Sequence, residues 1–168
     1  MQQFDTDMPL HLFHHGENFK AYMLMGAHPI TKNGKTGYVF RVWAPHAKEV
    51  YLIGSFNNWN ETAAPMCKMV DGETYELFVD GVQRYDEYKY LIITADGRKL
   101  YKADPYAFHS ETPGPTSSNS SKIYDLSGFK WTDKLYLDKR KHTDIYASPV
   151  NIYEVNLLSW KKHEDGLP

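Results

Sequence analysis

The stretch from Tyr38 to Asn60 limits what the chain can fold into more than any other part of the sequence. Two runs within it, residues 38–43 and 50–53, are rich in the β-branched and aromatic side chains that suit a half-buried sheet. Ala44-Pro45 separates the two runs. Because apolar side chains fall on both alternating faces, we expect at least one of these strands to be covered on both sides.

Similar strand-like runs recur at short intervals along the chain, at residues 74–79, 88–94, 99–102 and 122–124. Pairs of residues that favour tight turns lie before or between them, at Asn33-Gly34, Asp71-Gly72, Asp80-Gly81 and Asp96-Gly97. Short alternating strands with such turns are typical of antiparallel sandwiches. We therefore predict an all-β fold, an immunoglobulin-like antiparallel β-sandwich.

Composition excludes several classes of partner. The chain has 168 residues and a formal net charge of -2, which gives no general electrostatic reason to bind nucleic acid or an anionic membrane. The single cysteine, Cys67, has no partner for an internal disulfide, and no apolar run is long enough for a signal peptide or a membrane span. We expect a cytoplasmic protein without a cofactor. His11, His14 and His15 lack a carboxylate or thiol at a known ligand spacing, so we assign no metal site.

The chain divides by character into four parts. Residues 1–30 form an amino-terminal extension in which we expect one or two short helical turns, and residues 31–130 contain the sandwich. Residues 131–150 are charged and polar, as in a linker. The last part, residues 151–168, opens with the nearly continuous apolar run 151–158, which predicts a strand buried on both faces. Such a strand needs partners, so we expect the chain to be the front of a larger protein.

The segment Ser55–Asn60 places amides beside an indole, and this combination suggests a sugar-binding turn. Aromatic residues make up 15% of the chain, with 13 Tyr and 4 Trp. Flat aromatic faces stack on the apolar faces of sugar rings, although aromatic side chains also fill cores. Composition alone leaves both interpretations open.

Five motifs follow one another along the chain: FRVWAPHAKEVYLIGSFNNWN, TYELFVDG, YKYLI, KADPYAF and NIYEVNLLSW. In this order they resemble the amino-terminal portion of bacterial glycogen branching enzymes (1,4-α-glucan branching enzymes). The resemblance implies that the sandwich is a family-48 carbohydrate-binding module of the early-set immunoglobulin-like type. It also implies that NIYEVNLLSW is the first strand of a truncated catalytic (β/α)8 barrel of the α-amylase superfamily.

The implied full-length enzyme is a glycosyltransferase that cuts α-1,4-glucan chains and transfers them to form α-1,6 branches in glycogen biosynthesis. Such a retaining double displacement needs a carboxylate nucleophile and a carboxylic acid/base. In the resembled family these carboxylates lie on later barrel strands, so we assign no catalytic residue, and Asp104 and Glu154 are not promoted to that role. The 168 residues alone are expected to be inactive. The implied partners are an α-glucan, such as glycogen or a maltooligosaccharide, and the enzyme's own barrel.

The resemblance also implies a sugar-binding patch. Trp59 matches a tryptophan that stacks on glucose, Lys89 matches a lysine that binds hydroxyl groups, and Asn119 stands for an amide in a later loop. The chain departs from strong binders because residues 98–100, which follow Asp96-Gly97, contain no second tryptophan. One stacking surface is therefore missing from the motif. In a competing interpretation, the turn that carries Trp59 only braces the module against the barrel.

Two other functions fit parts of the same pattern. A non-catalytic glycogen-binding regulatory subunit would explain Trp59 and Lys89 but leaves the terminal run 151–158 without a purpose. A debranching enzyme of the same superfamily carries a similar leading module and uses related motifs with a hydrolytic outcome.

Overall fold

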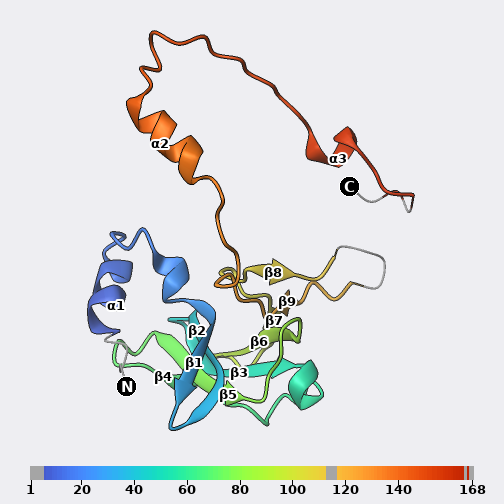
Figure 1. Cartoon of the computed structure of the whole chain (residues 1–168). Helices are drawn as coiled ribbons and strands as arrows, with labels where there is room; N and C mark the ends of the chain where they lie inside the picture. Colours follow the sequence, from blue (N-terminus) through green and yellow to red (C-terminus); the bar gives the residue numbers. More distant parts are fainter. Residues whose placement is uncertain (1–5, 113–116, 165, 167–168) are drawn as a thin grey trace. The chain divides into compact units, whose positions relative to one another are not determined.

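The computed structural model describes residues 6–112, 117–164 and 166, and it divides the chain into two units, Met1–Gly128 and Phe129–Pro168 (Figure 1). The first unit contains the helix α1 (Asp7–His14) and two short 3₁₀ turns, η1 (Ala21–Met23) and η2 (Ser55–Asn57). Its strands are β1 (Gly26–Lys32), β2 (Lys35–Trp43), β3 (Ala47–Gly54), β4 (Cys67–Lys68), β5 (Thr74–Asp80), β6 (Glu87–Thr94), β7 (Lys99–Lys102), β8 (His109–Ser110) and β9 (Ser121–Lys122).

The strands form two antiparallel sheets, which confirms the predicted β-sandwich. Sheet A has the order β1-β2-β5-β4. Sheet B has the order β3-β6-β9-β8, and β7 pairs with β6 on the side away from β3. The hairpin between β1 and β2 turns at Asn33 and Gly34, which both have positive φ, as a type I′ turn requires. The sandwich therefore begins with β1 at Gly26, inside the region that the sequence assigned to the extension.

Side chains from both sheets meet in one core. On β6, Tyr88 and Tyr90 are fully buried while Lys89 between them lies on the opposite face, as the alternation predicts. The core consists of Ala27, Phe40, Val42, Ala44, Ala47, Val50, Leu52, Met66, Tyr75, Tyr88, Tyr90 and Ile123.

Strand β2 is covered on both faces, as expected. Phe40 belongs to the core, whereas Val39 is buried on the other face, where Arg41 Nη1 donates to the carbonyl of Leu24 at 3.2 Å. Arg41 Nε also donates to Glu76 Oε2 on β5 at 2.8 Å. The helical turns α1 and η1 thus supply the predicted short helices and help to cover this face.

The second unit contains the helices α2 (Lys134–His142) and α3 (Leu157–Trp160). Its described residues include no strand, so the strand predicted over residues 151–158 is not formed here. Residues 151–156 are exposed and irregular, and Asn156 Oδ1 instead accepts a hydrogen bond from the amide of Leu158 at 3.0 Å at the start of α3. The physical reason is that a buried strand needs neighbouring strands, and the described part of this unit offers none.

The expected linker contains the helix α2, which lies wholly at the surface. Four basic residues fill its last turn, where positive charge is favourable for the helix dipole. Among the described residues, no helix has the length and apolar character needed to cross a membrane.

Candidate functional site

The turn that follows β3 is held by its own amides. Asn57 Oδ1 accepts a hydrogen bond from the amide of Gly54 at 3.0 Å, and Asn57 Nδ2 donates to the carbonyl of Leu52 at 3.0 Å. The amide of Trp59 then donates to the carbonyl of Gly54 at 2.8 Å. Asn57 is therefore a clamp that fixes the turn, and Trp59 is the side chain that the turn presents.

Trp59 has an unfavourable backbone conformation. Its φ is 57° and that of Asn58 is 54°, so two consecutive residues are left-handed. Asparagine tolerates this region, but a bulky residue there costs on the order of 1–3 kcal/mol. Trp59 nevertheless keeps 36% of its surface exposed. Backbone strain at a partly exposed aromatic residue is a feature of binding sites, so this combination favours a role in binding.

Comparing glycine and alanine at position 59 tests this strain. Both substitutions remove the indole, but only glycine adopts positive φ without steric cost, so we expect Trp59→Gly to be more stable than Trp59→Ala by about 1 kcal/mol in urea unfolding. Val70 is exposed and lacks positive φ, so the same pair of substitutions there should give the opposite order. If alanine were the more stable of the two variants at both positions, the Trp59 turn would hold no strain.

Lys89 lies on the outer face of sheet B, the face directed away from the core. It pairs across the ladder with Ile53, and Gly54 pairs with Tyr88, so Lys89 and the turn that presents Trp59 belong to the same end of the sheet. The ammonium group donates a hydrogen bond to the carbonyl of Ser118. A cationic donor, bonded to the carbonyl of Ser118, thus lies on the outer face of sheet B.

Asn119 lies in the loop that leads into β9. Because β9 pairs Ser121 with Tyr88, this loop runs beside Lys89. The Glu111 carboxylate orders the loop by accepting from the amides of Ser118 and Ser120 at 2.9 and 3.2 Å, and these donors hold the pKa of Glu111 below its usual value. Asn119 itself is exposed, with φ of 56°. The structure therefore brings Lys89 and the Asn119 loop together, with the Trp59 turn on the other side of β6.

The family model for carbohydrate-binding module 48 (isoamylase N-terminal domain) matches residues 24–107, which is half of the chain. The chain belongs to the carbohydrate-binding module 48 family. The match covers β1 to β7 and includes Trp59 and Lys89, whereas Asn119 lies beyond it.

Relatives of this module confirm the resemblance to branching enzymes. The chain is 47% identical to the 1,4-alpha-glucan branching enzyme GlgB of Bacillus caldolyticus over 161 residues, which cover 96% of this chain and 24% of that enzyme. The GlgB of Bacillus subtilis (strain 168) is 45% identical, with coverage of 96% and 25%. The chain is therefore homologous to the amino-terminal part of these enzymes and spans about a quarter of their length. Among solved structures, the pullulanase from Bacillus acidopullulyticus has a TM-score of 0.47 and 28% identity, over 61% of this chain and 12% of that one.

Three further residues at the outer face of sheet B, Glu61, Lys99 and Tyr101, were not identified from the sequence as part of a site. Glu61 follows Trp59 by two positions, and its carboxylate accepts from Lys99 Nζ and from the Tyr101 hydroxyl, each at 2.5 Å. These donors hold the pKa of the Glu61 carboxyl below its usual value. The turn that presents Trp59 is thus tied to β7. The alternation of Lys99 and Tyr101 along β7 is the only signal in the sequence that places both on one face.

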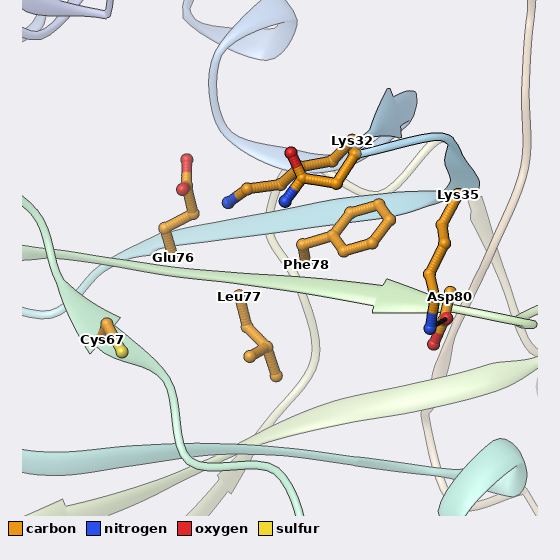
Figure 2. Close-up of a pocket in the computed structure, with 8 residues that line it drawn as sticks. Lys32, Lys35, Cys67, Glu76, Leu77, Phe78 and Asp80 are labelled. Carbon is orange, nitrogen blue, oxygen red and sulfur yellow. Dashed lines mark hydrogen bonds and ion pairs between the residues drawn. The ribbon is translucent and has the colours of Figure 1, made fainter.

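A pocket of about 560 Å³ opens on sheet A and not on sheet B (Figure 2). It lies at the edge of β5, and its lining includes Phe78 and the ion pair between Lys35 and Asp80, whose Nζ–Oδ2 distance is 2.7 Å. None of the three sugar-binding residues predicted from the sequence lines this pocket. A glucan chain needs an exposed aromatic face, and Trp59 lies outside this pocket, so the surface of sheet B is the better candidate.

Asp104 lies inside the module rather than on this surface. Its Oδ2 accepts from the Tyr88 hydroxyl at 2.7 Å and from the Tyr90 hydroxyl at 3.2 Å, and its Oδ1 accepts from the amide of Tyr106 at 2.8 Å. Burial raises the pKa of the Asp104 carboxyl above its usual value. These contacts give Asp104 a structural role, joining the loop after β7 to the core.

Proposed function

We propose that this module binds α-glucan chains, such as glycogen or maltooligosaccharides, on the outer face of sheet B and positions them for a branching enzyme. The observation that carries the proposal is the exposed Trp59, held in a left-handed conformation at the same end of the sheet as Lys89. Membership of the carbohydrate-binding family and the similarity to enzymes named as 1,4-alpha-glucan branching enzymes support it.

The chemistry of the three predicted residues suits a neutral sugar. The Trp59 indole offers a flat apolar face for one glucose ring. Lys89 supplies an ammonium donor for hydroxyl oxygens, and the Asn119 amide both donates and accepts. Among the described residues, the Asn119 side chain makes no hydrogen bond, so its amide remains available to a ligand.

The activity of the whole enzyme is part of the proposal. In it, a catalytic barrel transfers an α-1,4-glucan chain to a 6-hydroxyl group through a covalent glycosyl intermediate, and this module contributes binding rather than chemistry. The apolar run 151–158 would become the first barrel strand once neighbouring strands cover it. The module would then also contact its own barrel, which is the second proposed partner.

Calorimetric titration with maltoheptaose tests the site. Loss of one stacked aromatic surface should weaken binding by about tenfold in Trp59→Ala, and loss of a donor should weaken it by about threefold in Lys89→Ala and Asn119→Ala. Trp131→Ala provides the matched control, because Trp131 is also exposed but belongs to the other unit. Equal affinity in the wild type and Trp59→Ala would remove the proposed site and favour the interpretation that the turn only braces the barrel.

A further inference from the structure

The β6–β7 hairpin brings an exposed aromatic ring to the face that carries Lys89. Tyr101 pairs directly with Leu91, and directly paired residues point to the same side of a sheet. Leu91 and Lys89 are two positions apart on β6 and therefore share a face. Tyr101 keeps 48% of its surface exposed. Its ring is thus presented on the outer face of sheet B.

Glu61 fixes the position of this ring relative to Trp59. Strands β3 and β7 lie on opposite sides of β6, yet Glu61, which follows β3, bonds to Lys99 and Tyr101 on β7. The segment after Trp59 must therefore cross the outer face of the sheet. Burial of Leu91 on this face, with 1% exposure, agrees with such a crossing.

We propose that Tyr101 is the second aromatic surface of the glucan site, held in place by Glu61. This inference rests on the proposed function, since it extends the site of Trp59 and Lys89 along the same face. It also accounts for the departure seen in the sequence. The tryptophan missing after Asp96-Gly97 is replaced by a tyrosine from β7, displaced along the strand.

Two aromatic surfaces would favour a ligand that is long enough to contact both. A single indole contacts one glucose ring, so short and long oligosaccharides would gain equally from it. A second ring elsewhere on the face is reached only by a longer chain. Tyr101 should therefore select for α-glucan chains of several glucose units.

The test compares Tyr101→Ala, Tyr101→Phe and the control Tyr22→Ala by titration with maltoheptaose and maltotriose. Tyr22 is matched in residue type and exposure, at 47%, but lies in η1 beside sheet A. We expect Tyr101→Ala to weaken maltoheptaose binding about three- to tenfold and maltotriose binding less. Tyr101→Phe should keep most of the affinity, because it keeps the ring and loses only the bond to Glu61. Tyr22→Ala should bind as the wild type does.

The outcomes separate this inference from the proposed function. If Trp59→Ala loses binding while Tyr101→Ala binds both sugars as the wild type does, the role of Tyr101 is overturned and the proposed site stands. If Trp59→Ala binds normally, the proposed function itself fails. Equal losses for Tyr101→Ala and Tyr22→Ala, or an equal loss for both sugars in Tyr101→Ala, would also contradict a second surface. Circular dichroism of each variant verifies that it is folded.

Discussion

Replacing Asp104 by alanine is expected to lower the free energy of unfolding by about 3 kcal/mol or more. The substitution removes the acceptor of two tyrosine hydroxyls that are themselves fully buried, on Tyr88 and Tyr90. Each buried polar group left without a partner costs about 1–3 kcal/mol, and the space left by the carboxyl adds to this. Urea unfolding of the two proteins measures the difference.

A surface carboxylate serves as the control. Asp96 is exposed and accepts from the Thr94 hydroxyl and from Arg98 Nε, the latter at 2.7 Å, and such surface contacts contribute little in water. Asp96→Ala should therefore stay close to the wild type. A comparable loss of stability in Asp96→Ala and Asp104→Ala would show that the buried cluster has no special importance.

The same carboxyl makes stability depend on pH in a direction opposite to that of most acids. Burial raises the pKa of Asp104 above the ordinary value of 3.8, so the folded protein holds this proton more tightly than the unfolded chain. The stabilisation that this tighter proton binding gives the folded protein is complete below pH 3.8 and is lost as the pH rises through the folded pKa. The stability of the wild type relative to Asp104→Asn should therefore fall from pH 3.5 to pH 7. A constant difference between the two proteins would contradict the raised pKa.

The strands and turns of the sandwich could be predicted because local chemistry determines them. Alternation on β6 placed Lys89 opposite Tyr88 and Tyr90, and the hairpin at Asn33-Gly34 needs only residues that accept positive φ. The turn predicted over Ser55–Asn60 is present in the structure. The sequence showed amides beside an indole there but gave Asn57 no role of its own, and the structure shows that Asn57 binds the backbone of Gly54 and Leu52.

The sequence did not predict that Tyr101 lies on the outer face of sheet B, because this placement depends on the length of the turn between β6 and β7. A two-residue turn at Asp96-Gly97 would pair Tyr101 with Ile92, whose side chain packs against the core. The observed ladder pairs Tyr101 with Leu91, so the loop has one residue more, and Gly97 takes a φ of 83°. A shift of one residue moves every side chain of a strand to the other face. Sequence patterns indicate that a hairpin exists, but they do not determine its register.

For the apolar run 151–158, the sequence predicted a strand that the structure does not contain. Its composition is typical of a buried strand, but strand formation depends on neighbours, and the described residues of its unit include none. The sequence therefore indicates the environment that this segment requires rather than the conformation that it has here.

Gly54→Ala should destabilise the module and weaken the proposed glucan binding together. A Cβ atom at this position would lie 2.3 Å from the carbonyl oxygen of Glu87 and 2.6 Å from the Phe56 ring. Backbone in the neighbouring strand cannot move aside cheaply, so we expect a loss of about 2–3 kcal/mol in urea unfolding. Trp59 should also be displaced, because its amide bonds to the carbonyl of residue 54.

The control for this substitution is Gly128→Ala, where an added Cβ meets no atom within 4 Å. That variant should match the wild type in both stability and affinity for maltoheptaose. At low temperature, where Gly54→Ala remains largely folded, its affinity should still fall by about tenfold, as in Trp59→Ala. Normal affinity in a folded Gly54→Ala protein would mean that the close contact between β3 and β6 supports the sheet alone. Weakened affinity would show that the same contact also sets the position of the indole on the proposed glucan-binding face.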